Sequence, residues 1–184
     1  MNASGVLAAY EAIRGKLPVT AQAVRTGLSM VELPGRFQII PGQPTLVLDV
    51  AHNPHSVAAL TAILDAMGYF PTTHAVFGAM ADKDWTHMLT KVGPLIDRWY
   101  FTDLPTARAD SAQGLKSKLE QLQAEGLVRK DVSMECFANP QQALDAAVAA
   151  AEAADRIVVF GSFFTVGGVL QNGTPRLNAK HLAH

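Results

Sequence analysis

An apolar strand pattern that leads directly into a helix start constrains the fold of this chain more than any other stretch. Residues 45–50, Thr-Leu-Val-Leu-Asp-Val, have the β-branched and aliphatic character of a buried strand. Asn53 then suits a helix N-cap, and Pro54 suits the first helical position, where a missing N–H costs nothing. The polar residues between them are therefore expected at the carboxyl edge of a sheet, where open α/β sheets bind ligands.

The same alternation of extended and helical patterns continues along the chain. Asn139-Pro140 repeats the cap-and-proline helix start. This order predicts an α/β fold with a mostly parallel six-stranded sheet and helices on both faces. Strands are expected at 36–40, 45–50, 73–77, 97–102, 132–136 and 156–160, and helices near 57–67, 84–92, 111–124, 141–153 and 163–170.

Residues 1–33 precede every predicted strand. Helical patterns at 3–14, with Ser4 as a cap, and at 20–29 present apolar faces that have no sheet of their own to cover. Leu33-Pro34-Gly35 then interrupts the helical periodicity. We expect 1–33 to be the helical tail of a preceding domain, and 34–184 to be a separate domain.

Composition excludes several classes of function. Hydrophobic residues make up 49% of the 184 and charged residues 17%, as in an ordinary globular protein. A net charge of −1 argues against general electrostatic binding to nucleic acid or to an anionic membrane. The single cysteine, Cys136, allows no internal disulfide, and the chain opens with no apolar leader, so cytoplasmic residence is expected. Cys136 itself is expected to be a small core residue beside Phe137.

Several familiar catalytic motifs are missing from the sequence. It contains neither G-x-x-x-x-G-K-[ST] nor G-x-G-x-x-G, which removes the usual nucleotide cradles and weakens a dinucleotide-dependent oxidoreductase as an interpretation. His52 and His55 have no H-E-x-x-H motif or Cys pair beside them, which argues against zinc. Ser162 is not in a G-x-S-x-G elbow, which argues against a hydrolase nucleophile.

Polar loops follow four of the predicted strands and are expected to open on the same edge of the sheet. Besides the residues after 45–50, these are the loops 78–84, 102–108 and 161–165. Glycines at 78 and 161 allow close approach of the backbone to a ligand, and Lys83 and Ser162 offer donors to a carboxylate or phosphate. Together these loops predict an anion site.

Four short motifs carry a resemblance to a known family. They are Leu-Pro-Gly-Arg-Phe-Gln-Ile at 33–39, Asp-Val-Ala-His-Asn-Pro-His at 49–55, Gly-Ala-Met-Ala-Asp-Lys-Asp at 78–84 and Gly-Ser-Phe-Phe-Thr-Val at 161–166. In this order they resemble bacterial folylpolyglutamate synthase, also called dihydrofolate synthase, of the Mur ligase superfamily. The similarity runs over almost the whole chain, but only the C-terminal part of that enzyme is represented.

The resemblance implies a Rossmann-like Mur ligase C-terminal domain. Enzymes of this family use ATP and Mg²⁺ to join L-glutamate to dihydropteroate or folate through an acyl-phosphate. Their central domain carries the P-loop and the metal ligands, and their C-terminal domain closes over ATP and brings the amino acid. The chain is therefore expected to be inactive alone, to hold no metal, nucleophile or acid–base group, and to need the missing P-loop domain, L-glutamate and a pterin or folate as partners.

By the same resemblance, Arg36 would reach the ATP phosphates, Asp49 would accept hydrogen bonds from the ribose hydroxyls, and Asn53 would lie near the adenine. Each has a structural alternative. Arg36 could pair with a carboxylate on the neighbouring strand, and Asp49 and Asn53 could cap backbone N–H groups.

Lys83 and Ser162 would hold the carboxylates of the incoming glutamate, with His52 or His55 lining the same pocket. Lys83 could instead be a solvated surface lysine, and at least one of the histidines could be structural. A different class of function also stays open, namely a free-standing regulatory module that binds a nucleotide or an amino acid without catalysis.

Overall fold

The computed structural model describes residues 2–31, 33–175 and 177. The chain divides into two compact units, with the boundary between Leu33 and Pro34. The first unit contains α1 (Asn2–Ile13) and α2 (Ala21–Met30). Thr20 caps α2 by accepting a hydrogen bond from the Ala23 N–H at 3.1 Å. Ser4 lies inside α1, so its predicted role as a cap is wrong, because the helix begins at Asn2.

Large apolar side chains of the first unit are exposed. In α2 no residue is buried. An amphipathic helix pair of this size cannot bury its own apolar surface. The exposed apolar residues are Val6, Leu7, Tyr10, Ile13, Leu17, Leu28, Met30, Val31 and Leu33.

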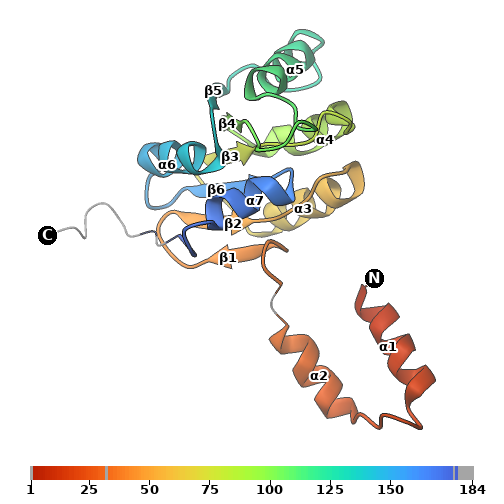
Figure 1. The fold of residues 1–184 in the computed structure, drawn as a ribbon. Helices are drawn as coiled ribbons and strands as arrows, with labels where there is room; N and C mark the ends of the chain where they lie inside the picture. Colours follow the sequence, from red (N-terminus) through yellow and green to blue (C-terminus); the bar gives the residue numbers. More distant parts are fainter. Residues whose placement is uncertain (1, 32, 176, 178–184) are drawn as a thin grey trace, which may run out of the picture. The chain divides into compact units, whose positions relative to one another are not determined.

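The second unit is built on the predicted six-stranded sheet. Its strand order is β1-β2-β6-β3-β4-β5, which Figure 1 shows from β1 at the bottom to β5 at the top. β1 is antiparallel to β2, and all other neighbours are parallel. The strands are β1 (Gln38–Ile40), β2 (Thr45–Leu48), β3 (Thr73–Phe77), β4 (Arg98–Thr102), β5 (Ser133–Phe137) and β6 (Arg156–Phe160).

Helices cover both faces of the sheet, as predicted. Residues of α3, α4 and α5 pack with Val47, Phe77 and Phe160 in one buried cluster. Residues of α6 and α7 pack with Leu46 and Val159 in the other. Because strand side chains alternate between faces, neighbouring strand residues divide between the two clusters. The helices are α3 (Pro54–Ala66), α4 (Trp85–Val92), α5 (Ala112–Ala124), α6 (Pro140–Ala150) and α7 (Phe163–Leu170), with a 3₁₀ turn η1 (Gly93–Leu95).

Some predicted boundaries and one burial assignment are wrong. α6 ends at Ala150 rather than 153, because Ala151 is extended and the Asp155 carboxylate accepts the Glu152 N–H at 2.8 Å, which ends the helical hydrogen bonding. Cys136 is exposed rather than a core residue, since β5 is an edge strand whose side chains are mostly solvent-accessible. Arg36 precedes β1 instead of belonging to it.

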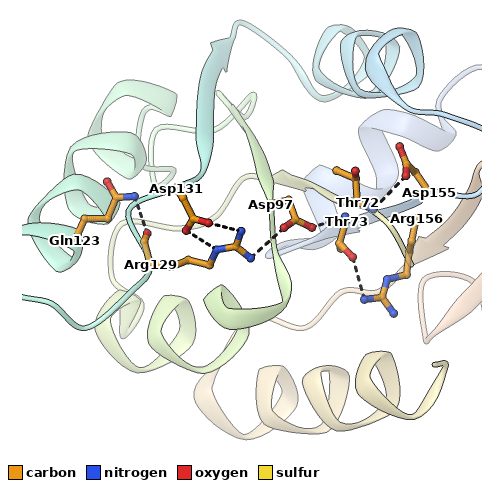
Figure 2. A network of polar contacts seen from close by, with 8 residues as sticks. All are labelled: Thr72, Thr73, Asp97, Gln123, Arg129, Asp131, Asp155 and Arg156. Carbon is orange, nitrogen blue, oxygen red and sulfur yellow. Dashed lines mark hydrogen bonds and ion pairs between the residues drawn. The ribbon is translucent and has the colours of Figure 1, made fainter. Parts of the chain in front are cut away.

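Polar side chains occupy the amino edge of the parallel strands, opposite the predicted ligand edge. Figure 2 shows Arg129 between Asp97 and Asp131, and Asp155 close to the start of β3. Asp97 accepts the Thr73 N–H at 2.7 Å, and Arg156 donates to the Thr73 hydroxyl at 3.1 Å. These contacts hold the amino ends of the strands, so they serve the fold, although the buried Nε of Arg156 has no partner among the described residues.

In the part of the chain that the structure describes, no helix is both long and apolar enough to cross a membrane. The longest helices, α3 and α5, have 13 residues each, which is short of the roughly 20 that a bilayer requires.

Candidate functional site

Three loops meet at the carboxyl edge of the sheet and are joined by short hydrogen bonds. The Gly161 N–H, after β6, donates to the Ala51 carbonyl, after β2, at 3.0 Å. The Thr165 hydroxyl donates to the Gly78 carbonyl, after β3, at 2.6 Å. Gly161 has φ +108, and a Cβ there would lie 2.6 Å from the Gly78 oxygen. Only glycine fits this junction of loops.

The loop after β4 joins the same cluster. The Ala81 N–H donates to the Arg108 carbonyl at 2.9 Å, and the Asp110 N–H donates to the Ala79 carbonyl at 3.0 Å. Met80 and Ala109 form an antiparallel bridge between these contacts. The loops 78–84 and 102–110 are therefore held together as one short ladder.

A pocket of about 350 Å³ opens between these loops. It brings together His52, Lys83 and Ser162, which are three of the four residues that the sequence predicted for glutamate. His55 is exposed at the start of α3 and does not line this pocket. The complete lining is His52, Met80, Lys83, Thr106, Arg108, Gly161, Ser162, Phe163 and Phe164.

Lys83 belongs to a small network of charged side chains and is not a fully solvated surface lysine. Its Nζ is 3.8 Å from an oxygen of Asp82, and the same oxygen is 3.4 Å from a terminal nitrogen of Arg108. The Lys83 side chain is 30% exposed and that of Arg108 is 73% exposed. Two cations thus approach one carboxylate at the mouth of the pocket, and exposed pairs of this kind are weak enough to exchange partners.

Ser162 and His52 are held by local hydrogen bonds. Ser162 is buried, and its hydroxyl oxygen caps α7 by accepting the Phe164 N–H at 3.1 Å. The Nδ1 of His52 is 2.7 Å from the Val50 carbonyl, so Nδ1 carries the proton and Nε2 is left as the acceptor of the neutral ring. The His52 ring also lies 6.0 Å from the ring of Phe163. Both side chains are therefore oriented before any ligand contact.

Asp49 stabilises the turn before β1. One carboxylate oxygen accepts the Phe37 N–H at 2.9 Å, and the other accepts the Ala51 N–H at 2.7 Å. Phe37 has φ +44, a left-handed conformation that an aromatic residue adopts only where surrounding contacts enforce it. Burial raises the pKa of the Asp49 carboxyl, although the two N–H groups lower it. Asp49 thus has the capping role that was its structural alternative.

Capping does not use all the accepting capacity of Asp49. A carboxylate oxygen can accept two hydrogen bonds, and each oxygen of Asp49 accepts one from the backbone. Asp49 is only half-buried, so a further donor can reach it. The carboxylate therefore fits a hydroxyl-bearing ligand such as a ribose.

Arg36 and Asn53 lie on the β1–β2 side of the cluster. Arg36 is exposed and makes no ion pair with a described residue; its guanidinium lies 5.3 Å from the centre of the Phe163 ring. Asn53 caps α3 as predicted: its side-chain oxygen accepts the Ser56 N–H at 2.9 Å, and the Ser56 hydroxyl lies 3.2 Å from the Asn53 nitrogen. The cap leaves the Asn53 amide NH₂ available to a ligand.

The sequence reasoning did not assign a role to Arg108, Thr106, Phe163 or Phe164, all of which line the pocket. The sequence predicts the loops that contain these residues. Which side chains of the loop 102–110 point into the pocket depends on its pairing with the loop 78–84. The two phenylalanines, which are 58% and 46% exposed, also border a neighbouring groove of about 580 Å³ beside α6. The signal available in the sequence is the pair of adjacent phenylalanines directly after Gly161-Ser162, at a helix start where apolar residues are often exposed.

The described residues include no group of three or more His, Cys, Asp or Glu that could hold a metal ion. Asp84, in the loop 78–84, caps α4 by accepting the His87 N–H at 3.2 Å, and it also contacts the His87 ring.

The chain is similar to known folate enzymes over most of its length. It is 37% identical to the dihydrofolate synthase/folylpolyglutamate synthase of Escherichia coli over 170 residues, which is 92% of this chain and 37% of that protein. It is 35% identical to a probable bifunctional folylpolyglutamate synthase/dihydropteroate synthase of Haloferax volcanii, covering 80% of this chain and 17% of the relative. The chain thus spans well under half the length of these relatives.

Solved structures agree with this similarity. E. coli FolC in complex with DHPP and ADP matches with a TM-score of 0.78 and 36% identity, over 93% of this chain and 38% of that one. A bifunctional folylpolyglutamate synthase/dihydrofolate synthase with Mn, AMPPNP and L-glutamate bound matches with a TM-score of 0.71 and 36% identity, over 85% of this chain and 36% of that one.

The family profile described as "Mur ligase, glutamate ligase domain" matches residues 35–163. The match begins one residue before Arg36 and ends at Phe163, which lines the pocket. The matched segment therefore contains the Asp49 turn, all six strands and every lining residue of the pocket except Phe164. This chain belongs to the family of Mur ligase glutamate ligase domains.

Proposed function

We propose that this chain is the C-terminal domain of an ATP-dependent ligase that adds L-glutamate to dihydropteroate, to folylpolyglutamate or to both. The observation that carries the proposal is the meeting of Lys83, His52 and Ser162 in one pocket. The relatives named for this reaction support the substrate class, and one similar structure has L-glutamate bound. In this proposal the domain binds glutamate in the pocket and nucleotide beside it.

The nucleotide would bind on the β1–β2 side of the pocket. Arg36 offers a planar, permanently charged guanidinium to the phosphates. Asp49 has accepting capacity for the ribose hydroxyls, and the Asn53 amide can contact the base or the loop that holds it. Complexes of similar structures with ADP or AMPPNP support a nucleotide as the second ligand.

The phosphate cradle would come from a P-loop domain that precedes the residues described here, with 1–33 as its last helices. The exposed apolar side chains of α1 and α2 support this assignment, because such helices need a further apolar surface to cover. Mg²⁺ is proposed to bind in that same domain, and a similar structure in complex with AMPPNP and Mn supports a divalent metal as part of the nucleotide site. Cytoplasmic residence belongs to the same proposal.

The contribution of this chain to the reaction is positioning. Lys83 binds a glutamate carboxylate, and the Ser162 and His52 side chains orient the amino acid so that its amine faces the nucleotide side. The uncharged amine then attacks the carbonyl carbon of the acyl-phosphate: the C–N bond forms, the C–O bond to the phosphate breaks, phosphate leaves, and the nitrogen loses one proton to solvent. Holding the two reactants in line lowers the entropic part of the barrier, and Arg36 stabilises the charge on the departing phosphate.

A complementation experiment tests this function. The 184-residue chain alone is expected to show no ATP-dependent ligation of glutamate, and fusion to the P-loop domain of a relative is expected to restore turnover. The matched control is the same fusion with Lys83→Ala, which should raise the KM for glutamate. Ligation by the 184-residue chain alone, or an inactive but folded fusion, would contradict the proposal. Tight binding of an unrelated effector by the chain alone would instead favour a regulatory module.

A further inference from the structure

Arg108 lies at the end of the pocket that is farthest from the nucleotide side. The order of strands is β2, β6, β3 and β4, and, apart from Thr106 of the β4 loop, each contributes one polar residue to the pocket from the loop after it. These residues, in the same order, are His52, Ser162, Lys83 and Arg108. The pocket therefore runs from the β2 loop beside Asp49 to Arg108.

The backbone at Arg108 is fixed, whereas its side chain is free to turn. The Arg108 carbonyl accepts the Ala81 N–H at 2.9 Å, and the adjacent Ala109 forms a bridge with Met80. The side chain is 73% exposed, and among the described residues its one polar contact is with Asp82. A long cationic side chain on a rigid base can bind a ligand group without moving the loop.

The charge of the pocket matches that of glutamate. Two of the lining residues, Lys83 and Arg108, are cationic, and none is acidic. Glutamate with the uncharged amine that attack requires carries two carboxylates and hence two negative charges. Because one oxygen of Asp82 contacts both cations, at 3.8 and 3.4 Å, these cations lie close enough to bind the two carboxylates of a single small ligand.

The direction of the reaction decides which carboxylate each cation binds. The amine must face the nucleotide side, where the acyl-phosphate forms, and the α-carboxylate is attached to the same carbon as the amine. The side-chain carboxylate is at the other end of the molecule. It therefore extends away from the β2 loop, past Lys83, to Arg108.

We propose that Arg108 is a specificity-determining residue that binds the side-chain carboxylate of the incoming glutamate, while Lys83 binds the α-carboxylate. The inference rests on the proposed function and names the residue that distinguishes glutamate from amino acids with neutral side chains. The planar guanidinium can bind the carboxylate with two parallel hydrogen bonds, which an ammonium cannot do.

The test is an NMR titration of the 184-residue chain with L-glutamate and, separately, with L-glutamine, whose side chain is an uncharged analogue. The wild-type chain is expected to bind glutamate more tightly. In Arg108→Gln the affinity for glutamate should fall by about 10- to 100-fold, the loss of one hydrogen-bonded ion pair. The affinity for glutamine should change by less than about twofold. Glutamine has no side-chain carboxylate, so the substitution of Arg108 removes no ion pair from its complex.

Two further variants make the result specific. Arg14→Gln is the control, because Arg14 is 71% exposed and paired with Glu11 at 3.6 Å, outside the pocket; it should leave both affinities unchanged. Asp82→Asn should tighten glutamate binding, because it removes a carboxylate that competes for both cations. The amide spectrum of each variant reports whether the fold is retained.

The outcomes separate this inference from the proposed function. If Arg108→Gln weakens glutamate and glutamine equally, or neither, Arg108 does not bind the side-chain carboxylate, although the glutamate pocket stands. If the wild-type chain shows no saturable shift of pocket residues with either amino acid, both the glutamate pocket and the role of Arg108 are refuted.

Discussion

Substitution of Gly161 by alanine tests whether the carboxyl-edge loops can join only through a glycine. Gly161 has φ +108, outside the range that L-residues ordinarily adopt, and this conformation alone costs about 1–3 kcal/mol for a residue with a Cβ. The new Cβ would lie 2.6 Å from the Gly78 carbonyl oxygen and 2.6 Å from the Phe77 ring. Overpacking of this kind costs about a further 1–3 kcal/mol.

Neither neighbour of Gly161 can move away easily. The Gly78 carbonyl accepts the Thr165 hydroxyl at 2.6 Å, and the Phe77 ring is fully buried among the rings of Trp85, Trp99 and Phe160. The structure therefore cannot relax to relieve the clash, and the conformational cost and the overpacking cost should add. We expect Gly161→Ala to lower the free energy of unfolding by about 2–6 kcal/mol.

Urea unfolding followed by circular dichroism measures this change. Gly167→Ala is the matched control, because Gly167 lies in α7, the helix that follows the same loop, and a methyl group at this position would have nothing within 4 Å. Alanine there should stabilise the helix by about 0.5–1 kcal/mol. A loss of less than about 1 kcal/mol in Gly161→Ala would refute the reasoning, since it would mean that the loops rearrange at little cost.

Three other variants test the separation of the two ligand sites and the polar contacts at the amino edge of the sheet. In an active fusion with a P-loop domain, Lys83→Ala should raise the KM for glutamate more than that for ATP, and Asp49→Ala should do the reverse; the opposite pattern in steady-state kinetics would mean that the two sites are exchanged. His74, near the amino end of β3, is fully buried, and its Nε2 lies 3.3 Å from an oxygen of Asp155. Burial lowers the pKa of His74 below its ordinary 6.5, so the neutral ring is favoured in the folded state and the stability that it contributes is lost as pH falls below 6.5. His74→Gln should flatten this part of the pH dependence of unfolding, and an unchanged slope would assign it to another group.

The strands and helices could be predicted because local patterns determine them. The segments 73–77 and 156–160 end in runs of apolar, partly β-branched residues typical of buried strands, and both of these predicted bounds match the structure. Asn53-Pro54 and Asn139-Pro140 start helices as expected, because side-chain capping and a fixed φ act within one turn of the chain. The end of α6 was missed because the carboxylate of Asp155, which lies beyond the helix, captures the Glu152 N–H.

Some features of the candidate site could likewise be predicted from the sequence, and others depend on the tertiary structure. Lys83, Ser162 and His52 were predicted from loops that follow strands, and the structure brings these three into one pocket. His55 was not separated from His52 by sequence, because both flank the same helix start; the side chain of His52 is turned to the pocket by its bond to the Val50 carbonyl. The capping role of Asp49, beside its capacity to bind a ligand, could not be predicted. It depends on Phe37, whose N–H reaches the Asp49 carboxylate only in the folded structure.

The sequence by itself determined the order of strands and helices, the capped helix starts and the family motifs, because each depends on residues close together in the chain. The tertiary structure alone decided the order of strands in the sheet, and with it the order of His52, Ser162, Lys83 and Arg108 across the pocket. That order depends on pairing between segments far apart in the chain: β6, nearly last in sequence, lies between β2 and β3. Its insertion places Ser162 between His52 and Lys83 and leaves Arg108 at the far end.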